Sequence, residues 1–206
     1  MRADKLKDKS RAYFDQVAVS DYVIPEPVLC YTEVLKQLQN STFDSLADIS
    51  CGTGDMLAEV IDAFGNGKTL YGVDLSPNAA KIAREKTSGH AEIIVGDVDD
   101  IPLDSSVVDI ALNMHSFHHY PNPAHALGEI HRILKPCGQF ILVENDYPFL
   151  RRVCSNIFQV ITRYRNGDIK MYSEKELMKL LHEADFKVLM GEHIADHSRM
   201  FVCRAR

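Results

Sequence analysis

The sequence predicts an α/β fold of three layers, in which a seven-stranded, mostly parallel sheet lies between helices. Three observations predict it. Short apolar or β-branched runs alternate along the chain with longer amphipathic stretches. A glycine-rich turn follows the first of these runs, as at the junction of a strand and a helix. The last two runs have no helical stretch between them, so we expect them to pair as an antiparallel hairpin.

Seven short runs are the expected strands. They cover 45–49, 69–73, 92–95, 108–112 and 139–144, and the hairpin strands lie near 186–192 and 199–204. Two helices between them have clear start signals. The helix expected over 76–86 begins Ser76-Pro77, a capping residue followed by proline at the first helical position. The helix expected over 123–134 carries apolar residues on one face.

One domain is expected, because 206 residues with 46% hydrophobic and 25% charged residues can build one sizeable core. Residues 1–40 contain two helical patterns, near 6–17 and 27–38, that are too short for a separate domain and are expected to form a lid. Residues 45–145 form the expected central core. Residues 148–184 are expected to be helices that cover a substrate, and residues 186–204 complete the sheet.

Composition and charge exclude several classes of partner. The formal net charge is -6 and no long run of lysines or arginines occurs, so nucleic acid is not an expected partner. No stretch approaches the roughly 18 apolar residues of a membrane span. The five cysteines are odd in number and form no C-x-x-C pair, which is typical of reduced thiols. We therefore expect a cytoplasmic protein.

The glycine-rich turn runs from Asp48 to Asp55 and predicts a nucleotide-like cofactor, because bare backbone and a helix start can approach a ligand there. The dinucleotide fingerprint needs a third glycine three residues after Gly54, where this chain has Leu57. No tyrosine is followed four residues later by lysine, the pair that short-chain dehydrogenases use. Both observations disfavour NAD-dependent hydride transfer, although a Gly-x-Gly pair alone is a weak signal.

Asp74 follows Gly54 by 20 residues, at the end of the second expected strand. A carboxylate in this place can accept hydrogen bonds from both ribose hydroxyls. This supports an adenosine ligand without separating the possible cofactors. The alternative is that Asp74 caps the helix that follows, a task for which Ser76 is better placed.

A third acidic position follows the third expected strand, in the segment Gly96-Asp-Val-Asp-Asp-Ile-Pro. Asp97 can accept from the exocyclic amine of adenine while the amide of Val98 donates to a ring nitrogen. The alternative is that the three aspartates of this segment form a solvated acidic loop. Asp97 lies nearest the strand and is the residue expected to bind.

The chain contains five motifs in this order: Asp48-Ile-Ser-Cys-Gly-Thr-Gly, Tyr71-Gly-Val-Asp-Leu-Ser-Pro, the Asp97 segment, Val108-Asp-Ile-Ala-Leu-Asn and His131-Arg-Ile-Leu-Lys-Pro-Cys-Gly-Gln. Together these motifs resemble those of Rossmann-like, class I S-adenosylmethionine-dependent methyltransferases. They are most similar to the enzymes of ubiquinone and menaquinone biosynthesis, over residues 45–145. The resemblance implies S-adenosylmethionine as cofactor and methyl transfer to a small-molecule acceptor. It implies these cofactor-binding residues: Asp48, Ser50, Gly52, Thr53, Gly54, Asp74, Leu75, Asp97, Val98 and Asn113.

Ser50 departs from this family pattern, which has a glycine at that position. A serine can adopt most conformations found at a strand end, so we expect the cofactor to bind. The added Cβ and hydroxyl are expected to tighten or reorient the pocket.

Three histidines after the fourth expected strand, His115, His118 and His119, are the candidate catalytic residues. Histidine is a suitable general base because its ordinary pKa lies near neutrality. The alternative is that they position the loop or contact the cofactor without moving a proton. No metal site is expected, since no carboxylate or thiolate lies at a ligand-like spacing in the sequence and methyl transfer needs no metal.

The segment 148–164 predicts an amphipathic helix that starts at Pro148 and carries basic residues on its other side. Our hypothesis is that one or two of these basic residues bind an anionic acceptor, and a solvated helix face is the alternative. The basic residues are Arg151, Arg152, Arg163, Arg165 and Lys170. Two other functions stay open: a protein that binds S-adenosylmethionine or S-adenosylhomocysteine without methyltransferase activity, and the NAD-dependent oxidoreductase.

Overall fold

The protein is described by a computed structural model over residues 3–20, 28–195 and 197–206, and the predicted α/β sandwich is confirmed. The strands are β1 (Ser45–Ile49), β2 (Thr69–Asp74), β3 (Glu92–Val95), β4 (Val108–Met114), β5 (Leu134–Asn145), β6 (Phe186–Ala195) and β7 (Ser198–Ala205). They form one seven-stranded sheet in the order β3-β2-β1-β4-β5-β7-β6. Neighbours from β3 to β5 pair in parallel, and β7 is antiparallel to β5 and β6, as the hairpin prediction required.

Seven helices accompany the sheet in the described part of the chain. They are α1 (Ala3–Ala18), α2 (Val28–Gln39), α3 (Asp55–Phe64), α4 (Pro77–Thr87), α5 (Pro123–Ile133), α6 (Phe149–Ile161) and α7 (Glu174–Glu183), with short 3-10 turns η1 (Gly65–Gly67) and η2 (Phe117–His119). Ser76 caps α4 as predicted, since its hydroxyl accepts from the amide of Ala79. None of these helices is long and apolar enough to cross a membrane.

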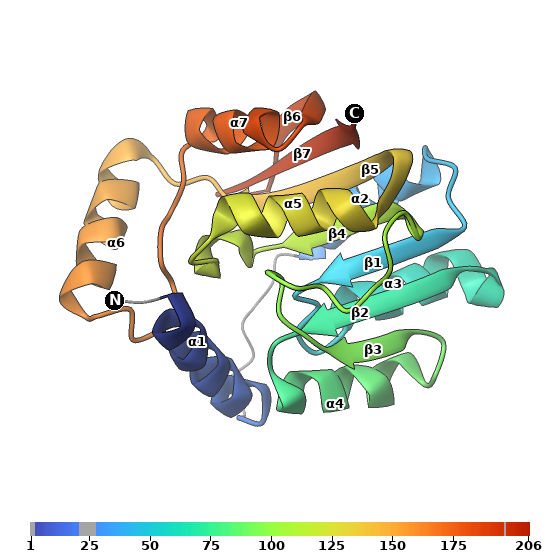
Figure 1. The fold of residues 1–206 in the computed structure, drawn as a ribbon, viewed down its shortest axis with the longest axis horizontal. Coiled ribbons are helices and arrows are strands. Elements are labelled where there is room, and N and C mark those ends of the chain that lie inside the picture. Colours follow the sequence, from blue (N-terminus) through green and yellow to red (C-terminus); the bar gives the residue numbers. More distant parts are fainter. Residues whose placement is uncertain (1–2, 21–27, 196) are drawn as a thin grey trace.

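Two hydrophobic cores lie on the two faces of the sheet, because successive strand residues point to opposite sides. In β5, Phe140 and Leu142 belong to one core, whereas Ile141 and Val143 belong to the other. Side chains of α5 and α7 complete the first core, and side chains of α2, α3 and α4 complete the second. Figure 1 shows these helices against the sheet.

The chain order along the sheet reverses beside β1, which has β2 on one side and β4 on the other. Such a switch point opens a crevice at the carboxyl ends of the strands, where ligands bind in α/β sheets. Figure 1 shows α1 and α6 beyond those ends, and in the described residues neither helix contributes a side chain to the two cores.

The two N-terminal helices differ in role. Cys30, Val34 and Leu38 of α2 are fully buried in the core, so α2 covers the sheet. Among the described residues, α1 alone is therefore left as the helix that can form the lid expected for residues 1–40. Pro27, the expected start of the second helix, lies outside the described residues.

Candidate cofactor crevice and histidine cluster

The turn after β1 has left-handed backbone at three alternate residues. Ser50, Gly52 and Gly54 have φ angles of 63°, 54° and 78°. A Cβ at Gly54 would lie 2.9 Å from the Cβ of Ala83, so glycine is needed for α3 to begin so close to α4. A Cβ at Gly52 would meet nothing within 4 Å. The backbone at Gly52 therefore borders open space that a ligand can enter.

Asp74, at the end of β2, binds the turn to the start of the next helix. One carboxylate oxygen accepts from the amide of Gly52 at 2.8 Å, and the other accepts from the amide of Ser76 at 2.8 Å. Burial raises the pKa of Asp74 above its ordinary value, and these two amides partly offset that rise. Each carboxylate oxygen has further lone-pair capacity, so Asp74 can accept from ligand hydroxyls as well.

Asp97 follows β3 and is engaged on both oxygens. Lys7 of α1 lies 2.7 Å from Oδ2 of Asp97 and 2.6 Å from Oδ2 of Asp99. The other oxygen of Asp97 accepts from the amide of Asp99 at 2.9 Å. An amine of a ligand at Asp97 must therefore share this carboxylate with Lys7 or replace it, a competition that the sequence did not predict.

α1 also contacts the crevice through Asp15 and Phe14. One carboxylate oxygen of Asp15 accepts from the hydroxyl of Ser76 at 2.7 Å and from the amide of Asn78 at 3.0 Å. The ring of Phe14 lies edge-on to that of His119, with 4.8 Å between centroids. α1 thus contacts both the start of α4 beside Asp74 and the histidines of η2.

The buried side chain of Asn113 supports the turn after β1. It is fully buried, and its Nδ2 lies 2.8 Å from the carbonyl of Ile49, 2.7 Å from Oγ of Ser116 and 2.6 Å from the hydroxyl of Tyr120. Its Oδ1 is buried and has no hydrogen-bond partner in the described part of the chain. Asn113 positions the end of β1 through the carbonyl of Ile49, and its predicted contact with the cofactor stays a prediction.

The departure at Ser50 has two physical consequences. Its backbone is left-handed, a conformation that favours glycine, so a serine is strained at this position. Its hydroxyl lies 2.7 Å from the hydroxyl of Tyr120, which joins Ser50 to the polar network around Asn113. Burial raises the pKa of Tyr120, so this hydroxyl stays neutral.

The other predicted cofactor residues lie at or next to the ends of β1, β2 and β3, and their contacts with a cofactor stay predictions. Asp48 is buried at the end of β1, and Leu75 follows Asp74 directly. The hydroxyl of Thr53 donates to the carboxylate of Asp55 at 2.5 Å, and this bond holds the end of the turn against the first residue of α3. Val98 is buried beside Asp97.

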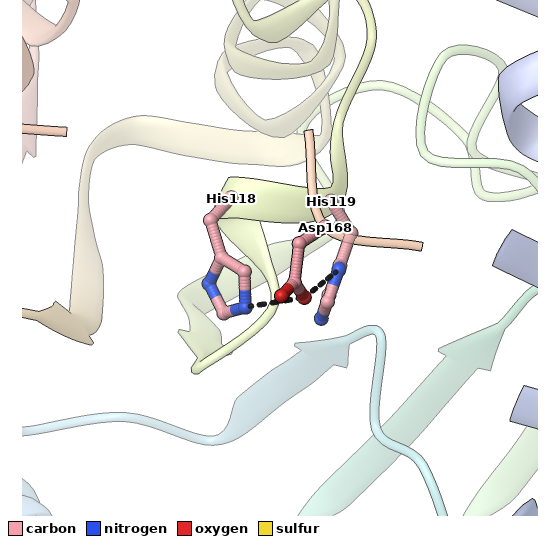
Figure 2. Close-up of side chains that lie close together, drawn as sticks. All are labelled: His118, His119 and Asp168. Atoms are coloured by element: carbon pink, nitrogen blue, oxygen red, sulfur yellow. Dashed lines mark ion pairs between the residues drawn. The ribbon is translucent and has the colours of Figure 1, made fainter. Parts of the chain in front are cut away.

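His118 and His119 lie on η2 and meet a carboxylate from a distant part of the chain, Asp168 (Figure 2). His118 donates through Nδ1 to Oε1 of Glu144 at 2.8 Å. Burial opposes protonation of His118, but the charges of Glu144 and Asp168 outweigh it and raise its pKa. Burial and the charge of His118 lower the pKa of His119 well below its ordinary value.

The sequence interpretation placed no carboxylate near these histidines, and the structure corrects it. Asp168 follows α6 and is brought to η2 by backbone hydrogen bonds from Ile169 and Lys170 to the carbonyl of His118. No short-range spacing reveals such a contact. His115, the third candidate, has left-handed backbone at φ 47° directly after β4, and its amide donates to the carbonyl of Val143.

The basic residues of the segment 148–170 are dispersed. Arg151 lies over the ring of Tyr147, 4.1 Å from its centroid, and Arg152 donates to the carbonyl of Tyr147. Lys170 pairs with Glu176 at 2.7 Å. Arg163 and Arg165 are exposed at the end of α6. The predicted binding of an anionic acceptor by these residues stays a prediction.

Comparison with known proteins identifies the central part of the chain. Residues 47–142 match the family model of the Methyltransferase domain. This match spans the crevice and η2. This part of the chain is similar to a methyltransferase domain.

Two curated methyltransferases are similar to this domain. The sterol 4-C-methyltransferase strm-1 of Caenorhabditis elegans is 32% identical over 126 residues, which are 57% of this chain and 37% of that protein. The demethylmenaquinone methyltransferase of Staphylococcus carnosus is 30% identical over 117 residues, 56% of this chain and 48% of that protein. The chain spans less than half the length of these two relatives.

A solved structure supports the fold of the methyltransferase domain over the whole chain. It is the 1,6-didemethyltoxoflavin-N1-methyltransferase of Burkholderia thailandensis, described with bound 1,6-didemethyltoxoflavin and S-adenosylhomocysteine. The TM-score is 0.78 at 17% identity, with 100% of this chain and 91% of that chain covered. The predicted Rossmann-like fold is therefore confirmed.

Replacement of Ser50 separates its strain from its hydrogen bond. Ser50→Ala keeps a Cβ at a left-handed residue and loses the bond to Tyr120, so its free energy of unfolding should fall by about 1 kcal/mol. Ser50→Gly removes strain and bond together and should stay within about 0.5 kcal/mol of the wild type. Urea unfolding measures both. An alanine variant as stable as the glycine variant would contradict the strain at Ser50.

Proposed function

We propose that this chain transfers the methyl group of S-adenosylmethionine to a small-molecule acceptor. The observation that carries the proposal is the convergence of the left-handed turn, Asp74 and Asp97 at the carboxyl ends of β1, β2 and β3, within a methyltransferase domain. When bound, S-adenosylmethionine supplies an electrophilic methyl group on a sulfonium, and S-adenosylhomocysteine is its product. The residues present fit this cofactor.

Each strand end has a separate task in binding. Asp74 accepts from the ribose hydroxyls with its remaining lone pairs, while Gly52 leaves the backbone open to the methionine part. Asp97 and the amide of Val98 bind the adenine edge once Lys7 shares or leaves the carboxylate. Asn113 keeps the carbonyl of Ile49 in place, so the turn is preorganised before the ligand arrives.

Methyl transfer depends mainly on holding the acceptor in line with the bond that breaks. In this chain α1 covers the crevice and so limits water beside the reacting groups. The acceptor lies next to η2, which carries His118 and His119, and next to the segment after β5. Similarity to sterol, quinone and toxoflavin methyltransferases supports a small organic acceptor.

Finer features of the reaction belong to the same proposal. An anionic acceptor would use Arg163 or Arg165, the exposed arginines at the end of α6, because Lys170 is already paired. A histidine base would be His119, which burial and the charge of His118 keep neutral by lowering its pKa, and which is for the same reason a weaker base than an ordinary histidine. We propose the cytoplasm as the location, since the five cysteines are free thiols.

Turnover with a panel of acceptors tests the proposed activity. Purified protein is incubated with S-adenosylmethionine and phenol, quinol, amine and carboxylate compounds, and S-adenosylhomocysteine is quantified. We expect formation above the acceptor-free control for at least one class. Tight binding of S-adenosylhomocysteine with no turnover in any class would support a cofactor-binding protein without methyltransferase activity.

Asp74→Asn should weaken binding of S-adenosylhomocysteine by about 10- to 100-fold, because hydrogen bonds to a charged acceptor contribute about 1.5–3 kcal/mol. Isothermal titration calorimetry gives the dissociation constant. Asp62→Asn, at an exposed carboxylate of α3, is the matched control and should bind like the wild type. Equal affinities for the two variants would remove Asp74 from the cofactor site.

A further inference from the structure

We propose that His118, His119 and Asp168 form a binding site for one divalent transition-metal ion, of which Zn²⁺ is the reference. The site lies at the carboxyl ends of β4 and β5, beside the cofactor crevice. Two imidazoles and one carboxylate are a common ligand set for such ions.

The distances between the ligand atoms fit a shared ion. Oδ1 of Asp168 lies 3.6 Å from Nε2 of His118 and 3.3 Å from Nδ1 of His119, and all three atoms lie within 4.8 Å of one another. Bonds of about 2.1 Å in a tetrahedral arrangement place neighbouring ligand atoms about 3.4 Å apart. Figure 2 shows the carboxylate between the two rings.

The same atoms do not satisfy one another by hydrogen bonds. A separation of 3.6 Å is too long for a hydrogen bond between His118 and Asp168. Nδ1 of His119 is buried and makes no hydrogen bond within the described residues. Nδ1 of His118 donates to Glu144, which directs Nε2 toward Asp168. The three ligand atoms therefore face one another across a small space that one cation can bridge, in place of a proton on Nε2 of His118.

Each ligand is also oriented by a second residue, as in established metal sites. Glu144 holds His118, and the side-chain amide of Gln159 donates to the other oxygen of Asp168 at 2.7 Å. The ring of His119 packs edge-on against the ring of Phe14. These partners fix the direction of the three ligand atoms without using them.

Three protein ligands leave at least one coordination position for water or a substrate oxygen. An ion with such an open position would bind the methyl acceptor through a hydroxyl or carboxylate oxygen. This role of the ion, unlike metal binding itself, rests on the proposed methyl transfer. An ion on Nδ1 of His119 also occupies the lone pair that a general base needs. The two roles of His119 are therefore exclusive.

Metal binding is tested without the cofactor or any acceptor. Zn²⁺ is titrated calorimetrically into protein dialysed against a chelator and then against buffer, and Co²⁺ is titrated with its visible absorption as a probe of low coordination number. We expect one equivalent to bind. Asp168→Asn and His119→Gln should each weaken binding at least about tenfold. His125→Gln, at an exposed histidine, and Cys154→Ser, at an exposed thiol, should not change it.

Circular dichroism verifies that each variant is folded, and either ligand variant alone is sufficient for the comparison. Absence of stoichiometric binding, or binding that both ligand variants leave unchanged, would overturn the site. Neither result bears on methyl transfer, which the acceptor panel measures separately.

A second inference rests on α6, which is oriented with its apolar side toward solvent. Seven of the eleven exposed large apolar side chains in the described residues lie on this helix, and they are between 37% and 75% exposed. They are Phe149, Leu150, Val153, Ile157, Phe158, Val160 and Ile161. A contiguous apolar face of this kind marks an interaction surface.

The polar side of α6 attaches it to the protein. The side-chain amide of Asn156 makes hydrogen bonds to both the carbonyl and the amide of Met171, at 3.0 and 2.7 Å. Gln159 is buried and binds Asp168. The outward position of the apolar side is thus fixed by specific hydrogen bonds.

Charge indicates what this face contacts. Residues 148–165 contain four arginines and no acidic residue, in a chain whose net charge is -6. Three of these arginines, Arg151, Arg163 and Arg165, are exposed. Exposed arginines near an apolar helix face match anionic headgroups above the acyl chains of a lipid bilayer. We infer that α6 binds the surface of an anionic membrane without crossing it.

Vesicle flotation tests this contact. The protein should float with vesicles of phosphatidylcholine and phosphatidylglycerol, less with phosphatidylcholine alone, and less at high salt. The double variant Leu150→Gln, Ile161→Gln should lose about tenfold or more in vesicle affinity. Met178→Gln, at an exposed apolar residue of α7, is the matched control and should bind like the wild type.

Absence of flotation with anionic vesicles, or equal flotation of the double variant, would overturn the inference. Analytical ultracentrifugation addresses the alternative occupant, a second copy of the chain. A dimer that the double variant abolishes, in protein that does not float, would assign the face to self-association instead.

Discussion

The carboxylate of Asp74 connects the segments that border the crevice at the ends of β1 and β2. One of its oxygens accepts from an amide of the turn after β1 and the other from an amide at the start of α4, so the turn, β2 and α4 meet at one side chain. A carboxylate buried without such donors would be strongly destabilising. The hydrogen bond from Gly52 to Asp74 fixes the conformation of the turn after β1, and this conformation requires left-handed backbone at Ser50 and Gly52. The geometry that admits a cofactor is therefore also a condition of local folding.

The sequence predicted the elements that depend on local signals. Ser76-Pro77 marks the start of α4, and the absence of a helical stretch before residue 198 marks the antiparallel hairpin. Asp74 and Asp97 were identified because strand ends are readable from apolar runs. The glycine turn was readable for the same reason, since its residues are contiguous.

Contacts between distant segments were not predictable in this way. Asp168 reaches His118 only because the segment after α6 pairs with the backbone of η2. Lys7 and Asp15 reach the crevice because α1 folds back across the strand ends. The apolar face of α6 was recognised from its periodicity, but periodicity does not say whether such a face points to a core or to solvent. Ser50 was recognised as unusual, whereas its left-handed backbone and its bond to Tyr120 required the structure.

We propose that the crevice binds S-adenosylmethionine and its product S-adenosylhomocysteine, and not a dinucleotide. The shift of the thermal unfolding midpoint that S-adenosylhomocysteine and NAD each cause at equal concentrations distinguishes these ligands. A ligand that binds only the folded state raises the midpoint more when it binds more tightly. We expect a rise with S-adenosylhomocysteine and none with NAD. A rise with NAD alone would contradict the proposed cofactor.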